Sequence, residues 1–250
     1  TTSRSYGDNT FTQMMWLKVT SVYFTVRLGW DAMFQDADVV WWKDPRPWFQ
    51  SEPNQYDTYW QDDGARSARY TPFSANTGFY YIRLNKRTQH FMHELFQSFN
   101  LISQWRSHQH VLNMLLIDHH SRFGTGVKIL DQELFSIGQM FHRRKPFMRD
   151  LVRDKFQQSI LFHWSWTAGK VEKLKYSKET GMWYLKDSCD EKAINKNAGK
   201  PSFLEGCCRE KDPSHTFLNF DEKWTEPEWM DEAWLPPAQR ERLAKAKGKK

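Results

Sequence analysis

Two aspartates interrupt an otherwise strongly apolar segment of this chain, which reads AMFQDADVVWWKDP from Ala32 to Pro45. Charged side chains are rarely buried unless they are paired or bind a metal ion. Asp36 and Asp38 are one residue apart, so at the end of an extended strand both carboxylates point to the same side and repel each other. A divalent cation removes that cost, because carboxylate oxygens are hard ligands that suit Mg²⁺, Mn²⁺ or Ca²⁺. The alternative interpretation is an exposed Asp-x-Asp turn.

Segments of helical periodicity alternate with apolar segments of strand length. The pattern predicts helices over residues 9–28, 85–103 and 107–118, and strands over 31–35, 39–42, 76–84, 126–136 and 159–166. Asn9 or Thr10 is the expected cap of the first helix, and Gly29 its end. Residues 50–70 are expected to form a polar surface loop, residues 142–150 a basic linker, and the chain from Cys189 onward mostly loops.

This alternation is typical of an α/β domain with a mainly parallel sheet flanked by helices. In such sheets ligands collect beyond the carboxyl ends of the strands, which is where Asp36 and Asp38 fall. The expected domain covers residues 1–235, followed by a basic, disordered tail over 236–250.

The formal net charge of +6 does not indicate nucleic-acid binding. Six basic residues and one Glu lie in the last twelve positions, QRERLAKAKGKK, so the rest of the chain is nearly neutral. A nuclease would need a basic groove and more acidic metal ligands, and this charge distribution offers neither.

The three cysteines are Cys189, Cys207 and Cys208. A bridge from Cys189 to either of the other two would suit a secretory lumen, and one thiol is left over. No cysteine or histidine spacing indicates structural zinc. No apolar run approaches the roughly 18 residues that span a bilayer, so membrane attachment is expected only through a segment outside this chain.

Four segments in order resemble one protein family. The stretch Tyr6–Pro45 contains a Tyr-Gly pair, a Lys-bearing helix and an Asp-x-Asp-Val-Val-Trp run. It is similar to the central motif of nucleotide-diphospho-sugar transferases. Within that group it most resembles glycosyltransferase family 77, the plant and algal arabinosyl-, xylosyl- and galactosyltransferases. ANTGFYYIR resembles that family's Asn-x-Gly-Phe strand, and HQHVLN stands where Asp-Gln-x-x-x-Asn is usual. FHWSWTAGKVEKLKYSKETGMW resembles its late His…Gly…Lys…Gly-x-Trp block, so the matches run from Tyr6 to Trp183.

The resemblance implies a GT-A fold, which is Rossmann-like, and transfer of a sugar from a nucleotide sugar with retention, using Mn²⁺ or Mg²⁺. It makes Asp38 a metal ligand, and it gives Asp36 a shared role at the ribose or donor sugar and the metal. His163 would complete the metal's protein ligands, and imidazole suits Mn²⁺ better than Mg²⁺. Without the resemblance, His163 would be interpreted as a hydrogen-bonded core histidine.

The resemblance also assigns donor-binding residues. Lys170 and Lys173 would offset the charge of the departing diphosphate, unless they form a solvated helix face. Asn76, Thr77 and Gly78 would line the sugar pocket, with Gly78 allowing close approach of the backbone, unless they form an ordinary turn before a strand. Gln109, at a helix N-terminus, would hold the sugar or the acceptor.

Two departures from the family pattern concern catalysis. His108 stands where the family has an Asp that is a candidate for stabilising an oxocarbenium-like transition state, and an imidazole cannot supply that negative charge. His108, Gln109 and Asn76 are therefore the candidate catalytic positions. The first strand and helix, which bind the base in this fold, have no counterpart before Tyr6, so the chain is expected to lack the first strand.

The predicted function is thus a metal-dependent glycosyltransferase that moves a sugar from a nucleotide-sugar donor to a glycan or glycoprotein acceptor. Its full-length form would be a type II membrane protein of the Golgi lumen. The alternative is a catalytically inactive relative that binds glycans or scaffolds other Golgi enzymes. The aromatic stretch FDEKWTEPEWMDEAW would suit sugar stacking or protein contact.

Overall fold

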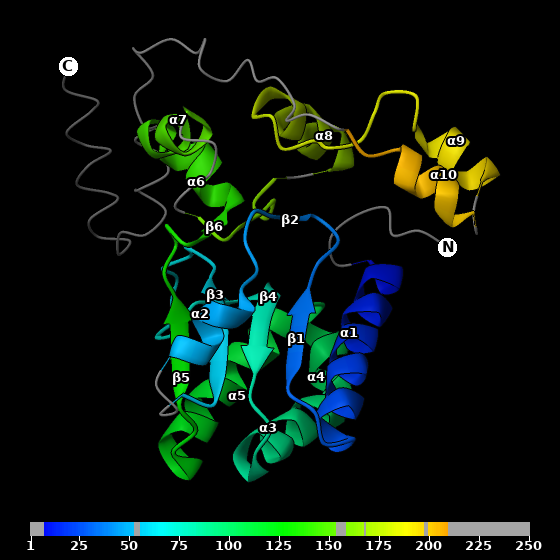
Figure 1. Cartoon of the computed structure of the whole chain (residues 1–250). Helices are drawn as coiled ribbons and strands as arrows, with labels where there is room; N and C mark the ends of the chain where they lie inside the picture. Colours follow the sequence, from blue (N-terminus) through cyan, green and yellow to red (C-terminus); the bar gives the residue numbers. More distant parts are fainter. Residues whose placement is uncertain (1–7, 53–55, 154–158, 168, 198–199, 210–250) are drawn as a thin grey trace, which may run out of the picture.

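The computed structural model describes residues 8–52, 56–153, 159–167, 169–197 and 200–209 (Figure 1). The predicted domain end at residue 235 and the predicted tail over 236–250 lie outside the described residues. Within them the chain forms a four-stranded and a three-stranded sheet with helices around them. The predicted α/β class with flanking helices is therefore confirmed.

The larger sheet has the strand order β1-β4-β3-β5. Its strands are β1 (Ala32–Gln35), β4 (Ala75–Ile82), β3 (Thr58–Asp62) and β5 (Val127–Leu130). β4 runs antiparallel to both β1 and β3, and only β3 and β5 are parallel. The expectation of a mainly parallel sheet is wrong: a parallel neighbour needs a crossover connection, usually a helix, and the connection from β3 to β4 contains no helix.

The two faces of this sheet are covered by different elements. Trp60, Tyr80 and Ile82 pack against α1 (Asn9–Arg27), α3 (Lys86–Gln97) and α5 (His108–Phe123), and α4 (Phe99–Trp105) joins the same core. The alternate residues Tyr59 and Phe79 face α2 (Arg46–Ser51) on the other side. This is the two-residue alternation of a strand buried on both faces.

The smaller sheet has the order β2-β7-β6, formed by β2 (Val39–Trp41), β7 (Leu161–His163) and β6 (Phe135–Ile137). β2 pairs antiparallel with β7 in a register that sets Val39 opposite His163. This sheet packs with α6 (Gly138–Arg143) and α7 (Lys145–Arg153), and α8 (Lys170–Glu179) follows β7 (Figure 1). The strand predicted over residues 126–136 is in fact two strands, β5 and β6, which belong to different sheets.

Helix α1 fixes the position of β1, the strand that leads into Asp36. Its cap is Asp8, whose carboxylate accepts from the N–H of Phe11 at 2.7 Å, so the cap lies one residue before the predicted Asn9. Val19, Val22 and Val26 face the core at helical spacing. Gly29, at φ +94°, turns the chain into β1 in the left-handed conformation that glycine adopts without strain.

Two predicted loops contain regular structure. Residues 58–62, inside the predicted surface loop, form the fully buried strand β3, whose polar side chains find partners within the protein. The predicted basic linker forms the end of α6 and most of α7, where Met148, Leu151 and Val152 are buried. No helix in the described ranges is long and apolar enough to cross a membrane.

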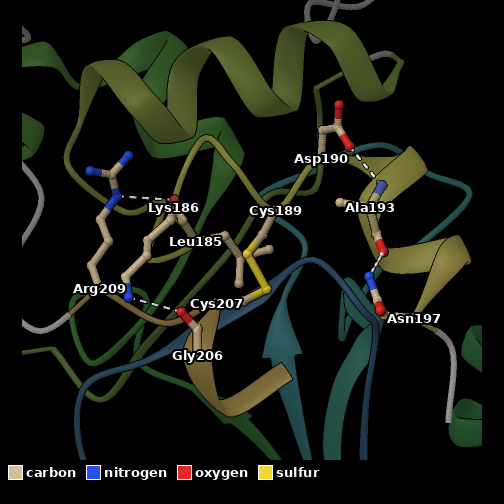
Figure 2. Close-up of a disulfide and its surroundings, with 9 residues drawn as sticks. All are labelled: Leu185, Lys186, Cys189, Asp190, Ala193, Asn197, Gly206, Cys207 and Arg209. Atoms are coloured by element: carbon tan, nitrogen blue, oxygen red, sulfur yellow. Dashed lines mark hydrogen bonds between the residues drawn. A yellow bond between two sulfur atoms is a disulfide. The ribbon is translucent and has the colours of Figure 1, made fainter. Parts of the chain in front are cut away.

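A disulfide links the two ends of the segment from Cys189 to Cys207 (Figure 2). Between them the chain forms the short helices α9 (Glu191–Lys196) and α10 (Pro201–Gly206). The bridge joins Cys189 to Cys207, which resolves the alternative left open by the sequence, and Cys208 is free and exposed. Around it, Lys186 donates to the carbonyl of Gly206 at 2.8 Å, as drawn in Figure 2.

Replacing Cys207 by Ser is expected to loosen this segment. Closing a loop of this length stabilises a fold by roughly 3 kcal/mol through the entropy of the unfolded chain. The amides of Lys186 and Arg209 hydrogen-bond across the bridged segments, to Cys207 and Tyr184, so their hydrogen exchange should accelerate by one to two orders of magnitude, as a rough estimate. Cys208→Ser is the control and should leave exchange unchanged; equal protection in both variants would contradict the prediction.

Candidate functional site

Asp36 and Asp38 lie where the two sheets meet. Asp36 directly follows β1, and its N–H donates to the carbonyl of Gly78 at 2.7 Å, while Asp38 directly precedes β2. Because β2 pairs with β7, His163 lies beside Asp38 despite its distance along the sequence. Asp36, Asp38 and His163 each offer one ligand atom, and these atoms all lie within 4.8 Å of one another. The structure thus brings the three predicted metal ligands together.

The orientation of the His163 ring is set by Gln61. The amide nitrogen of Gln61 donates to the carbonyls of Phe135 at 3.0 Å and Ser136 at 2.9 Å, so its oxygen must be the atom that faces His163. That oxygen accepts from Nδ1 of His163 at 2.8 Å. In the neutral ring, Nε2 therefore carries a lone pair, which is the form that binds a metal ion.

That lone pair points toward negative charge. Nε2 of His163 lies 3.5 Å from Oδ1 of Asp38. A lone pair and a carboxylate oxygen facing each other need a cation or a proton between them. The donor set, one imidazole and two carboxylates, suits Mn²⁺, so the residues present fit the predicted metal.

Gly78 is required by the same histidine. A Cβ at this position would lie 2.0 Å from Cε1 and 2.6 Å from Nε2 of His163, so no other residue fits without moving the ring. The close approach predicted for Gly78 is thus made to the imidazole of a metal-ligand candidate. β4 and β7, which belong to different sheets, touch at this point.

Two lysines balance the two aspartates. Lys18 of α1 pairs with Asp36, and Lys173 of α8 pairs with Asp38. Burial by itself would raise the pKa of Asp38, but the hydrogen bond and charge that His163 supplies when a proton occupies Nε2, together with Lys173, outweigh it and hold that pKa well below its usual range. The prediction that Lys173 reaches the site fits this geometry, whereas Lys170 is exposed in the first turn of α8.

A second set of polar side chains surrounds the carboxylate of Asp63. Its Oδ1 accepts from the amide of Asn76 at 2.6 Å and from the amide of Gln109 at 3.1 Å. The Oε1 of Gln109 accepts from both the N–H and the hydroxyl of Thr77 at 3.2 Å, and the Oδ1 of Asn76 accepts from the N–H of Gly78 at 2.7 Å. The predicted residues Asn76, Thr77 and Gln109 therefore form one connected network next to the three ligands.

Asp63 is not among the predicted site residues, because the polar composition of residues 50–70 predicts a surface loop. A signal is present in the order of the residues: Asp62 ends strand β3 and Asp63 directly follows it, as Asp36 follows β1. Burial raises the pKa of Asp63 to about 6, against the lowering effect of its hydrogen bonds with Asn76 and Gln109. A buried carboxyl that titrates close to neutral pH is typical of functional sites.

His108 does not act as a charged group here. Burial, and then the charge of Lys18, lower its pKa to about 3, so the ring is neutral at physiological pH. Its Nε2 has no hydrogen-bond partner among the described residues. Where the resembling family has a carboxylate before Gln109, this chain has a neutral imidazole, and the carboxylate that contacts Gln109 comes from Asp63 instead.

The comparison with known proteins shows the family of this chain. A model of the nucleotide-diphospho-sugar transferase family matches residues 1–176, which includes the three ligand candidates, the Asp63 network and Lys173. The chain belongs to this family, and the resemblance described from the sequence is confirmed.

Two curated relatives are glycosyltransferases by name. The chain is 25% identical over 212 residues to the UDP-galactose:fucoside alpha-3-galactosyltransferase of Dictyostelium discoideum, a match that covers 78% of this chain and 31% of that protein. It is 23% identical over 193 residues to the beta-arabinofuranosyltransferase RAY1 of Arabidopsis thaliana, covering 71% and 35%. The chain thus spans about a third of the length of these relatives.

Among solved structures, the chain is similar to a glycosyltransferase involved in the glycosylation of the major capsid of PBCV-1. The TM-score is 0.44 at 10% identity, over 67% of this chain and 74% of that one.

Proposed function

We propose that this chain carries the donor site of a metal-dependent glycosyltransferase, which moves a sugar from a nucleotide-diphosphate sugar to a glycan or glycoprotein acceptor with retention at the anomeric carbon. The observation that carries the proposal is the convergence of Asp36, Asp38 and His163, with Gln61 holding the Nε2 lone pair of His163 toward the carboxylates. Family membership supports the nucleotide-sugar donor.

The charges of the site favour a diphosphate ligand. Two carboxylates are already balanced by Lys18 and Lys173, so a bound Mn²⁺ or Mg²⁺ leaves the site with an excess of positive charge. When bound, the metal would supply Lewis-acid stabilisation of the leaving diphosphate. Lys173 is placed to pair with a phosphate oxygen instead of Asp38 once the metal neutralises that carboxylate. Lys170, one helical turn earlier, would contact the more distal part of the donor.

The Asp63 network is suited to the sugar. Its carboxylate can accept hydrogen bonds from sugar hydroxyls, and its charge would stabilise the positive charge that develops at an oxocarbenium-like transition state. Asn76 and Gln109 hold that carboxylate in place by donating to it. Thr77 donates to Gln109 and Gly78 to Asn76, so this part of β4 lies beside the carboxylate.

A second candidate function is a catalytically inactive relative that binds glycans or scaffolds other enzymes. The neutral His108, at the position where the resembling family has an Asp, favours it. The two candidates differ in turnover, because only the enzyme releases a nucleotide diphosphate.

We also propose that the protein works in the Golgi lumen, with membrane attachment through a segment outside this chain. The disulfide between Cys189 and Cys207 supports an oxidising compartment, because such bridges are rare in reducing ones.

The deciding experiment is a panel of nucleotide sugars, beginning with UDP-sugars because one relative is named for UDP-galactose. Release of nucleotide diphosphate should require Mn²⁺ or Mg²⁺. It should fall at least about tenfold when a chelator removes the metal ion from its ligands, and it should return when Mn²⁺ is added back. If no donor is turned over and Asp38→Ala binds nucleotides as the unaltered protein does, the enzyme proposal is contradicted and the inactive relative is favoured.

A further inference from the structure

A second group of metal-ligand side chains lies between helices α3 and α5. His90 and Glu94 of α3 and His119 of α5 each offer one ligand atom, all within 4.8 Å of one another. Nε2 of His119 lies 2.8 Å from Oε2 of Glu94, and Nε2 of His90 lies 3.1 Å from Oε1 of the same carboxylate. We call these three side chains the His90 cluster.

Helix geometry explains why the three side chains converge. His90 and Glu94 are four residues apart and share one face of α3, which packs against α5. The side chain of His119 is fully buried, with its ring against the rings of Phe91 and Phe123 at centroid distances of 5.2 and 4.9 Å. One ligand is therefore rigidly held by packing.

The other two ligands face solvent. The side chains of His90 and Glu94 are 43% and 37% exposed, and both line an open surface cavity together with His93. An ion can enter from this side, and a water molecule can occupy the coordination position that the protein leaves open.

The His90 cluster is separate from the candidate donor site. Helix α5 carries Gln109 in its first turn and His119 just before its last turn, and ten residues of helix rise by about 15 Å. In Figure 1, α3 lies at the end of the larger sheet that is opposite to α8, which supplies Lys173.

We propose that the His90 cluster binds one Zn²⁺ ion, which links α3 to α5. Two imidazoles and one carboxylate with an open fourth position form a donor set that suits Zn²⁺, whereas Mg²⁺ and Ca²⁺ prefer oxygen ligands alone. Tetrahedral Zn²⁺ with ligand bonds of about 2.0–2.1 Å separates its donor atoms by roughly 3.3 Å, and the two closest donor pairs here are 2.8 and 3.1 Å apart.

The affinity is expected to be micromolar. Nδ1 of His119 is buried and has no hydrogen-bond partner among the described residues, whereas a metal-binding histidine usually donates from its second nitrogen to an acceptor. Lack of that acceptor weakens metal binding by roughly 10- to 100-fold.

The test uses untagged full-length protein that carries Asp36→Asn, Asp38→Asn and Cys208→Ser, so that neither the donor site nor the exposed thiol binds Zn²⁺. This parent should bind one equivalent of Zn²⁺ in calorimetry, and Co²⁺ should give the visible absorption bands of a low-coordinate site. With Zn²⁺ at about 100 times Kd, Tm should rise by about 5–10 °C.

Single substitutions in that parent locate the ion. His90→Gln removes a half-exposed ligand and should weaken Zn²⁺ binding at least about tenfold and abolish the Co²⁺ spectrum. His93→Gln is the matched control, because it changes a histidine of the same helix that lies outside the cluster, and it should bind as the parent does. His119→Gln should also lose the ion; because that residue is buried, His90→Gln decides the result if this variant fails to fold.

Two outcomes would overturn the proposal: a parent that binds no Zn²⁺ up to millimolar concentration, or equal binding by His90→Gln and His93→Gln. In either case Glu94 serves only as a hydrogen-bonding bridge between two imidazoles.

Discussion

Gly78→Ala is expected to lower the proposed glycosyl transfer by about 100-fold, because it displaces His163 without removing any functional group. The added Cβ would lie 2.0 Å from Cε1 of the ring, a contact that the ring can relieve only by moving an ångström or more. That movement would break the hydrogen bond from Nδ1 to Gln61 and carry Nε2 away from Asp36 and Asp38. A displacement of this size at a reacting centre is enough to account for the loss.

The measurement is the Mn²⁺ dependence of turnover together with Mn²⁺ affinity. The variant should need at least about tenfold more Mn²⁺, as expected when one ligand is misplaced. Gly206→Ala is the matched control, since a Cβ at Gly206 would meet nothing within 4 Å and the residue has no positive φ. Equal Mn²⁺ affinity in Gly78→Ala and the unaltered protein would show that His163 is not a ligand.

Asp63→Asn is expected to abolish most activity while it stabilises the fold. Asparagine keeps the Oδ1 acceptor that Asn76 and Gln109 use, so the network can persist and only the negative charge is lost. If that charge stabilises the transition state, turnover should fall by about 100- to 1000-fold, the usual cost of removing one electrostatic stabiliser.

The same substitution, Asp63→Asn, is expected to lower turnover but to raise the stability of the fold. Burial raises the pKa of Asp63 to about 6 in the folded state, above its ordinary value of 3.8. The folded state therefore binds the proton more tightly than the unfolded state, so this carboxyl favours folding at low pH and loses that contribution as the pH rises through about 6. At pH 7.5, Asp63→Asn should raise the free energy of unfolding by on the order of 1–3 kcal/mol.

Thermal unfolding and turnover, each followed from pH 4.5 to 8, check both parts. Turnover of the unaltered protein should fall as the pH drops through about 6, when Asp63 is protonated. Asp62→Asn is the control: it weakens the ion pair with Arg66 and should lower stability while largely preserving turnover. A lower Tm and unchanged turnover in Asp63→Asn would assign Asp63 a structural role only.

Local patterns in the sequence were sufficient for many elements. Gly29 ends the first helical segment, as predicted from residue type and spacing, and the helix expected from residue 85 starts there, with Asn85 as the cap of α3. The strands on either side of Asp36 and Asp38 also lie where their apolar runs are.

The missed elements share one cause. The polar residues Gln61 and Asp62 predict a loop where β3 lies, yet each is buried with a partner supplied by the fold. The partners are the carbonyls of β6 for Gln61 and the side chain of Arg66 for Asp62. A periodicity pattern predicts such polar residues to be exposed, because it contains no information about hydrogen-bond partners that the tertiary fold supplies. The direction in which strands pair is likewise absent from a local pattern, which is why the mixed sheet was expected to be mainly parallel.

The sequence by itself determined that two carboxylates one residue apart follow an apolar segment, because that placement depends only on the order of the residues, and it favoured a cation near them. Only the tertiary structure decided which cationic and metal-binding side chains lie next to these carboxylates. Lys18, Lys173 and His163 approach the two aspartates from three separate elements, and Gln61 fixes the proton of His163 from a fourth. These choices depend on distances through space, as does the raised pKa of Asp63.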